Sequence, residues 1–266
     1  MQNETLSIFE PACQDNEEKI FAHGIREEIK RMCHELGGVT ETARKLNLKF
    51  KQVCEWPWRG KPIPLKQLDR MIEFLPAEKR LEYRQRFDEK EFYLSANYSG
   101  HKMKFPKKLS PELCYIVGLL LGDGSISGSF QKGFRKRVIQ VFFDSSDHAE
   151  LYSYLLVSTF ALKPKKYPRR GCVCLSISSF VFHWFFCTYF GFIGGKKADR
   201  IIIPDRIFQT QNTDLTKPAF AGCLIPTDLA FQAPDRFVMP VQAAKYSIKS
   251  ALYWKPKAFV LSAARD

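Results

Sequence analysis

Asp123 ends an apolar segment and is the first side chain in the sequence that could hold a metal ion. The stretch SPELCYIVGLLLGDG, from Ser110 to Gly124, has no charged residue between Glu112 and Asp123. It predicts a helix that Ser110 caps, that has a proline in its first turn and that stops at Gly124. A carboxylate at the negative end of a helix dipole is unfavourable by about 0.3–1 kcal/mol unless a cation faces it. A divalent metal would be that cation, and a solvated capping aspartate is the alternative.

The glycines of this segment predict a close helix–helix contact. Gly118 and Gly122 are four residues apart and share one helix face, where a second helix can come close. A second, weaker helical segment, KPAFAGCLIPTDLAF, contains Gly222 and another acid, Asp228. We expect Gly118 and Gly122 to lie at a close helix–helix interface.

The segment IVGLLLGDGSIS resembles the signature helix of the LAGLIDADG homing endonucleases, and the acidic-glycine pair of that motif falls on Asp123 and Gly124. The order of predicted elements from about Ser110 to Phe208, including GGKKADRIIIPD, is similar to the family as well. The resemblance implies two signature helices side by side, with Gly222 of the second helix at the same interface as Gly118 and Gly122. It also implies an acid at the end of each helix that binds Mg2+, and a saddle of antiparallel strands on duplex DNA. It makes Asp123 and Asp228 the metal-binding catalytic acids.

The resemblance also implies that Lys197 is a third catalytic residue, since a lysine after a glycine lies near the scissile phosphate in that family. Phosphodiester hydrolysis needs a metal-activated water and charge neutralisation on the phosphate, which metals held by carboxylates supply.

The second motif departs from the family pattern. Cys223 stands where the close-packing glycine belongs, Pro226 lies within the helix and Leu229 replaces the final glycine. After Asp228 only 38 residues remain, fewer than the first unit needs. We therefore expect an incomplete second repeat, in a truncated or degenerate protein or in one that a homodimer completes.

Positive charge points to a polyanionic partner. The chain has 41 Lys+Arg and 28 Asp+Glu, a formal net charge of +13. Basic runs interleaved with Tyr and Phe fall on predicted loops and strand edges and suit phosphate contacts. The candidate DNA contacts in this unit are Lys132, Arg135, Lys136, Arg137, Lys163, Lys165, Lys166, Arg169, Arg170 and Lys196.

The N-terminal segment GGVTETARKLNLKFKQVCEWPWRG resembles the helix-turn-helix of phage-repressor-like regulators. The resemblance implies a first helix from Thr40, its N-cap, to Leu46 and a recognition helix over Lys49 to Trp56. Lys49, Lys51 and Gln52 would then face a DNA groove. A small structural helical bundle is the alternative.

Composition excludes several other classes of protein. With 45% hydrophobic residues and 23 Phe the chain can bury a core. Eight cysteines in 266 residues are too sparse for a disulfide scaffold, which favours a reducing, cytoplasmic location. Cys172 to Gly195 carries no charge, yet serines and His183 interrupt it, so we expect a strand and a buried helix rather than a membrane span.

These observations predict an α+β fold in which an all-α helix-turn-helix domain precedes a LAGLIDADG-like mixed unit of αββαββα type and an incomplete second repeat. The expected domains are a flexible acidic arm (1–24), the helix-turn-helix (25–76), a charged helix and basic linker (77–108), the first endonuclease-like unit (109–210) and a partial second unit (211–266). The expected function is Mg2+-dependent hydrolysis of double-stranded DNA at a long specific site. The alternative is a catalytically decayed relative that only binds DNA through its helix-turn-helix.

Overall fold

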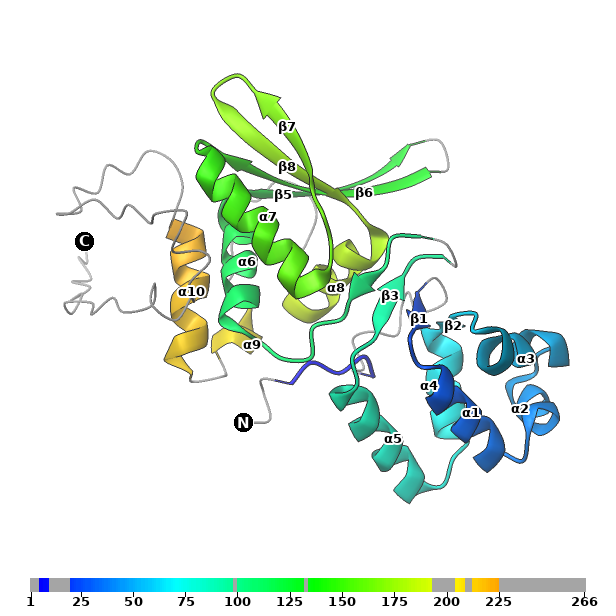
Figure 1. Cartoon of the computed structure of the whole chain (residues 1–266). Coiled ribbons are helices and arrows are strands. Elements are labelled where there is room, and N and C mark those ends of the chain that lie inside the picture. The colour runs from blue at the N-terminus through cyan, green and yellow to red at the C-terminus, as the bar shows by residue number, and fades with distance from the viewer. Residues whose placement is uncertain are drawn as a thin grey trace, which may run out of the picture. The chain divides into compact units, whose positions relative to one another are not determined.

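The computed structural model describes residues 5–9, 20–97, 100–131, 134–192, 204–208 and 212–224. In these segments, helices combine with two antiparallel four-stranded sheets, so the fold is α+β (Figure 1). None of the helices in them is both long enough and apolar enough to cross a membrane.

Four short helices fill the segment expected to form a helix-turn-helix. They are α1 (Arg26–Glu35), α2 (Val39–Leu46), α3 (Phe50–Arg59) and α4 (Leu65–Glu73). They bury apolar residues such as Leu46, Val53 and Leu68 between them. Helix α2 begins at Val39, because Gly38 takes the N-cap position, two residues before the expected cap Thr40. Gly38 has a φ of 95°, which suits glycine, and its carbonyl accepts a hydrogen bond from the Thr42 hydroxyl (2.8 Å).

A small sheet joins segments that are distant in the sequence. Its strands are β1 (Phe21–His23), β2 (Ile63–Pro64), β3 (Tyr93–Ser95) and β4 (Met103–Lys104), in the order β2-β1-β3-β4. The expected basic linker therefore supplies two of the four strands. The expected loose arm is also packed where the structure describes it, since Leu6 and Ile8 are buried and Thr5 pairs with Lys108. Apolar side chains in a mostly acidic segment are the cause.

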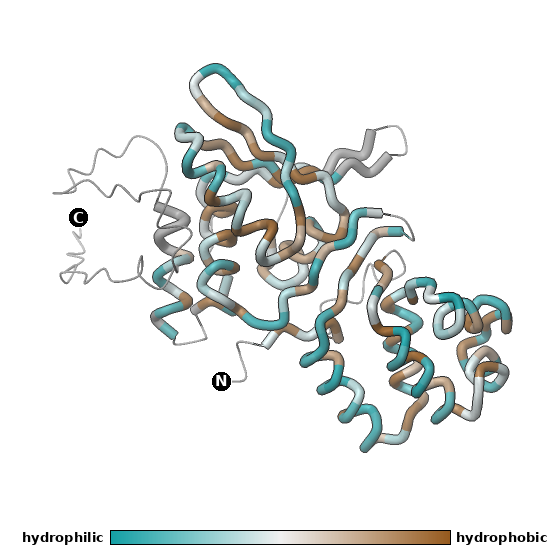
Figure 2. The backbone as a smooth tube through the Cα atoms, in the orientation of Figure 1, coloured by the Kyte–Doolittle hydropathy of each residue, from teal (hydrophilic) through white to brown (hydrophobic). Residues whose placement is uncertain are grey.

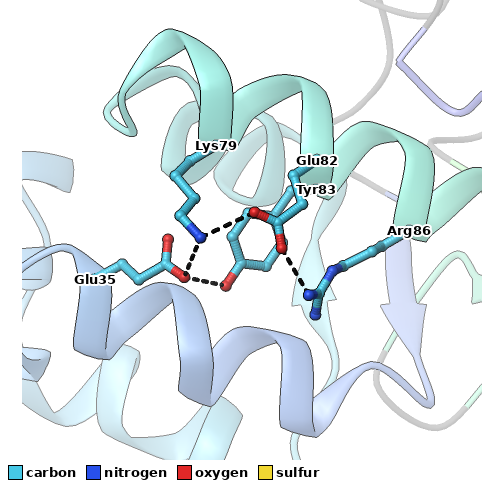
Figure 3. Close-up of polar contacts among 5 residues, drawn as sticks. All are labelled: Glu35, Lys79, Glu82, Tyr83 and Arg86. Carbon is cyan, nitrogen blue, oxygen red and sulfur yellow. Dashed lines mark hydrogen bonds and ion pairs between the residues drawn. The ribbon is translucent and has the colours of Figure 1, made fainter.

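Helix α5 (Ala77–Glu89) packs against α1 through one buried tyrosine (Figure 3). The hydroxyl of Tyr83 donates to Glu35 Oε1 (3.1 Å), and burial raises the pKa of this phenol far above its usual range. Lys79 lies between Glu82 (2.9 Å) and Glu35 (3.9 Å), and Arg86 pairs with Glu82 (2.6 Å). Ion pairs as exposed as these contribute about 0–1 kcal/mol each, so the tyrosine holds the two helices together.

The second half of the described chain follows the order helix, two strands, helix, two strands, helix. The elements are α6 (Pro111–Gly122), β5 (Gly124–Gln131), β6 (Phe134–Phe143), α7 (Ser146–Phe160), β7 (Lys165–Arg169), β8 (Cys172–Ser178) and α8 (Phe180–Phe190), followed by α9 (Asp205–Phe208) and α10 (Thr213–Leu224). The strands form one sheet in the order β5-β6-β8-β7. This order agrees with the expected arrangement, and Ser110 caps α6 as expected, accepting a hydrogen bond from Leu113 N–H.

Strand β7 lies where a basic turn was expected. It is the outer strand of the sheet, and all five of its residues are exposed. Pro168 fits an edge strand, because a proline there does not interrupt a central ladder. In Figure 2 this strand is mostly hydrophilic, whereas its neighbour β8 is more hydrophobic.

Aromatic side chains form much of the core of this half. Phe160 of α7 makes an edge contact with Phe182 of α8 (5.0 Å between ring centroids), and Phe185 lies 5.4 Å from the same ring. The cluster extends to the segment after β4, because Phe105 contacts both Phe185 (6.0 Å) and Tyr189 (5.7 Å). Such pairs add about 0.5–1.5 kcal/mol each beyond the area they bury.

Helices α6 and α10 make the most extensive contact of any pair of elements in the described segments. A Cβ atom built on Gly118 would lie 2.0 Å from the backbone oxygen of Ala219, so the two helix backbones touch there. Helix α10 starts four residues before the helical segment expected at 217–231 and is described as far as Leu224. Pro226 and Asp228 lie outside the described residues.

Replacement of Gly118 by alanine is predicted to destabilise the fold. The added methyl group would overlap a backbone atom, which cannot rotate away, so the two helices must separate. We expect a loss of about 2 kcal/mol or more in the free energy of unfolding, measured by chemical denaturation. Leu81→Ala, at a side chain that is 61% exposed on α5, is the control and should cost less than about 0.5 kcal/mol. Equal midpoints for Gly118→Ala and the unmodified chain would contradict the close contact.

Candidate nucleic-acid interface

The sheet of strands β5 to β8, whose strands are the longer ones, is the larger sheet. Helices cover one of its faces, and no helix of the described segments covers the other. Figure 1 shows α6, α7 and α8 on one side of strands β5 to β8. On β6, the side chains that point to the helices are Ile139, Val141 and Phe143, all buried. Successive residues of a strand point to opposite faces, so Gln140 and Phe142 lie on the other face. That face is the candidate interface.

Cross-strand pairing places some of the basic residues on this open face. Residues directly opposite each other in antiparallel strands share a face. Gln140 pairs with Ser176 and Phe142 with Cys174, and these in turn pair with Lys165 and Tyr167 of β7. Arg169 follows by alternation. Lys165, Tyr167 and Arg169 therefore lie in one row on the open face.

A cation–π contact holds one of these cations across the sheet. The guanidinium of Arg169 lies 5.6 Å from the centre of the Phe142 ring. On the far side of the sheet, the same face carries Ser125 and Ser127 of β5, which pair with Gln140 and Val138. Arg170 is exposed in the turn after β7, and Lys163 is exposed before it. The face thus combines cations, an aromatic ring and hydroxyl groups, all of which suit phosphate and sugar contacts.

Two cations expected at the same surface point to the helix side instead. The guanidinium of Arg137 bonds Nδ1 of His183 (3.4 Å) and lies 4.6 Å from the centre of the Phe180 ring. Lys166 bonds the Ser146 hydroxyl (3.1 Å) and pairs with a carboxylate of α7 at 3.6 Å. Arg137 is two positions from buried Ile139, and Lys166 pairs with buried Leu175 of β8, so both lie on the helix side of the sheet. The sequence run of positive charge is therefore divided between two faces.

His183 is a core residue, as expected. It is buried, and burial followed by the nearby charge of Arg137 lowers its pKa to about 4. The neutral ring can accept a hydrogen bond from Arg137 at Nδ1. The Cys187 sulfur lies 3.4 Å from the same nitrogen, and burial raises the pKa of this thiol. These contacts fix α8 against β6 and leave no role for His183 as a metal ligand at this nitrogen.

Asp123 lies at the junction between α6 and the sheet. It is the C-cap of the helix, half-buried, and its N–H donates to the carbonyl of Leu119 (3.0 Å). Gly124 follows and begins β5. A Cβ on Gly124 would lie 2.7 Å from the backbone of Leu120, so only glycine lets the chain turn from helix to strand without displacing the helix. Gly124, the second residue of the acidic-glycine pair, is therefore required by the geometry of the turn.

The donor set around Asp123 suits a metal that takes most of its ligands from elsewhere. Within the described segments, no three His, Cys, Asp or Glu side chains cluster as a metal site would require. Mg2+ usually takes one or two carboxylates and completes its shell with water and substrate phosphates. The Asp123 carboxylate fits such a site as its one protein acid, whereas it does not fit a closed structural zinc site.

Several sequence candidates lie outside the described residues. These are Asp228, Lys132, Lys196 and Lys197. Arg135 and Lys136 belong to β6, but their side chains are not described. Gly222 lies in α10, one helical turn beyond Ala219, and Gly122 lies one turn beyond Gly118 in α6.

The N-terminal helices present a second basic surface. Helix α2 ends at Leu46 and α3 begins at Phe50, with Asn47 in the left-handed region (φ 54°), so the connecting turn is three residues long. At the start of α3, Lys49, Lys51 and Gln52 are all exposed. The Gln52 side-chain oxygen accepts from the Lys49 N–H (3.2 Å) and so helps to cap the helix. This capping role of Gln52 was not predicted from the sequence.

Tyr167 and Phe142 are the interface candidates that the sequence analysis missed. Two-residue alternation from buried Val141 and Phe143 would place Phe142 on the open face. Tyr167 could be assigned only once KKYPR was known to be a strand.

Comparisons with known proteins assign the chain to no family. No family model matches the chain, and the search of curated proteins finds no match. The likeness to LAGLIDADG enzymes therefore depends on the residues and geometry given above.

Stability is predicted to fall below neutral pH because two histidines are held neutral. Burial, and then Lys102, lowers the pKa of His23 to about 4, as burial and Arg137 do for His183, from a usual 6.5. The unfolded chain then binds more protons than the folded chain between these values. The histidine contribution is present above the unfolded pKa and decreases as the pH falls from 6.5 towards 4.

The measurement is chemical denaturation at about pH 7.5 and about pH 5. His183→Gln should reduce the difference between the two midpoints, as should His23→Gln. His34→Gln, at an exposed position on α1, is the control and should leave the difference unchanged. A pH difference that is the same in all three variants would contradict the burial of neutral rings.

Proposed function

We propose that this protein binds duplex DNA with the open face of its larger sheet and hydrolyses a phosphodiester with a metal held at Asp123, as LAGLIDADG homing endonucleases do. The observation that carries the proposal is the row of Lys165, Tyr167 and Arg169 on a sheet face without helices. Asp123 directly precedes β5, whose Ser125 and Ser127 belong to that same face. An acid at the edge of a cationic sheet suits a nuclease.

The shape of the surface supports a duplex as the partner. Paired antiparallel strands fit the major groove of B-form DNA, where side chains reach base edges while cations contact the phosphates. The β7–β8 hairpin supplies cations on its open face, and Gln140 and the serines there can donate and accept hydrogen bonds. Lys163 and Arg170 extend the positive charge along the edge strand.

Asp123 has the role of a metal-binding acid in this proposal. Mg2+ bound there would supply an activated water and neutralise charge on the scissile phosphate. The protein contributes the carboxylate and its fixed position at the end of α6, where the negative end of the helix dipole also favours a cation. Lys197 and Asp228 remain sequence proposals for the same reaction.

The N-terminal helices would add a second DNA contact. A three-residue turn between α2 and α3 and exposed Lys49 and Lys51 at the start of α3 suit a helix-turn-helix whose recognition helix enters a groove. Gln52 can still donate through its amide nitrogen while its oxygen caps the helix. Two linked contacts with one duplex would raise the affinity of the whole chain.

Binding without cleavage is the second candidate function. The observation that favours it is the sequence from Cys223 onward, where Cys223, Pro226 and Leu229 depart from the motif that α6 follows. A chain with one metal-binding acid would keep the cationic sheet and the helix-turn-helix. Such a chain would act on DNA only by binding to it.

Asp123→Asn separates these two functions. If the protein is a nuclease, the variant should lose at least about a hundredfold in Mg2+-dependent nicking of duplex DNA from the region flanking its own gene, because an amide is a poor ligand for Mg2+. Its affinity for the same DNA should stay within about threefold, since a single carboxylate contributes little to phosphate binding. Unmodified protein that binds but does not nick at any Mg2+ concentration would leave binding as the function.

A paired substitution tests the open face. Lys165→Gln together with Arg169→Gln should weaken duplex binding and reduce the slope of log K against log salt by about 2, because two phosphate contacts are lost. Lys166→Gln is the matched control from the same strand, since its side chain turns toward α7, and it should change the slope much less. Equal slopes for the double variant and the unmodified chain would move the binding site off this sheet.

A further inference from the structure

Helix α10 follows the pattern of α6 up to one residue and departs from it afterwards. In α6, Gly118 is followed five residues later by an acid and then a glycine, Asp123 and Gly124. In α10, Ala219 touches Gly118, and Gly222 lies one turn further on the same face. After Gly222 the sequence is CLIPTD (223–228), in which a proline follows the glycine at the fourth position and the acid at the sixth.

We propose that the gene encodes a second copy of the α6 motif directly after Gly222, in the reading frame that begins one nucleotide earlier. In that frame the second metal-binding acid is present in the DNA and absent from this chain. Loss of one nucleotide where the Gly222 and Cys223 codons meet would produce this situation. Asp228 is then an incidental aspartate and has no catalytic role.

The genetic code permits a second motif in the shifted frame, but only with particular codons in the present frame. Each codon of the shifted frame consists of the last nucleotide of one codon and the first two of the next. Because cysteine codons begin with TG, the first shifted codon is NTG and encodes Leu, Val or Met. If Leu224 is encoded by TTG, the second shifted codon is TTT or CTT, which encode Phe and Leu. The third shifted codon is then GAT, which encodes Asp. An apolar helix position is therefore restored where the chain has Cys223.

The following shifted codons restore the acid and the glycine. With CCG for Pro226 and ACG for Thr227, the shifted codons over Thr227 and Asp228 are GAC and GGA, which encode Asp and Gly. If Gly222 is encoded by GGT or GGC, Cys223 by TGT and Ile225 by ATA, the shifted segment reads Gly-Leu-Phe-Asp-Thr-Asp-Gly, beginning at Gly222. Its acid and final glycine follow Gly222 at the same distances at which Asp123 and Gly124 follow Gly118. The shifted codon over Pro226 consists of the last nucleotide of the Ile225 codon and CC, so it encodes Thr, Ser or Pro.

One event accounts for three separate departures. The shift explains the cysteine after Gly222, the proline within the helical segment and the missing acidic-glycine pair. A single deletion produces all three departures at once, whereas independent substitutions would need at least three separate events. Upstream of the shift, α10 keeps the backbone contact of Ala219 with Gly118. The frame inference itself does not depend on catalysis, and it rests on the proposed function only for the role of the second acid.

The deciding test is the nucleotide sequence of the gene, read from genomic DNA of independent isolates. The codons of Leu224, Pro226 and Thr227 are expected to end in G, and the shifted frame is expected to have no stop codon through the nucleotides that encode Asp266. Any other third nucleotide in the codons of Pro226 or Thr227, or a stop codon in this stretch, would overturn the inference.

A gain of function tests the consequence for the protein. Insertion of one nucleotide before the Cys223 codon should convert nicking into double-strand cleavage, with at least a tenfold rise in linear product from a plasmid that carries the flanking DNA. Insertion of two nucleotides at the same place is the matched control and should give no rise. If the codons are as expected and neither chain cuts, the proposed nuclease function fails while the frame inference stands. If the codons differ and the unmodified chain still nicks, the reverse holds.

Discussion

Helix α6 is apolar on every side, and covering it determines the arrangement of the second half of the chain. Eight of its twelve residues are buried, so no face can remain in water without a loss of about 25 cal/mol for each Å2 exposed. Helix α7 and strand β5 cover part of it, and α10 covers the rest. Gly118 lets α10 come into backbone contact, and Gly124 lets the chain leave α6 directly into the sheet. Asp123 lies between Gly118 and Gly124 in the sequence, and its position is fixed because the residues around it are packed.

The same reasoning explains which parts of the fold could be predicted from the sequence. Strong local patterns were sufficient for α6, α7, α8, β6 and β8, since apolar periodicity and capping residues such as Ser110 act over short distances. The direction of single side chains in the sheet could not be predicted. KKYPR resembles a basic turn until its pairing with β8 is known, and only the register shows that Lys165 and Lys166 point to opposite faces. Likewise, Gly38 replaced the more obvious cap Thr40, because the tight turn before α2 needs a positive φ.

Net charge overestimates the number of phosphate contacts for a related reason. Lys107 belongs to the basic run KFPKK, yet its ammonium lies 3.7 Å from the centre of the Phe92 ring and donates to the carbonyl of Phe87. Burial lowers its pKa to about 7, with a partial opposing effect from Asp88. This lysine joins the segment after β4 to α5 and the aromatic core. Together with Arg137 it shows that part of the formal charge of +13 stabilises the fold and is not available to DNA.

The proposed DNA binding and the proposed catalysis depend on different parts of the chain, so they need not be lost together. The open face of the sheet is built entirely from β5 to β8, and the helix-turn-helix candidate from α2 and α3, all of which precede α10. The contact that α6 needs from α10 is already made at Ala219, before the residue at which we place the frame change. A shift after Gly222 would therefore remove the second acid and whatever follows it while it leaves the cover of α6 and the cationic face in place. Double-strand cleavage needs two acids and would be lost first, whereas affinity for duplex DNA would remain because its cations lie on strands that the shift does not reach.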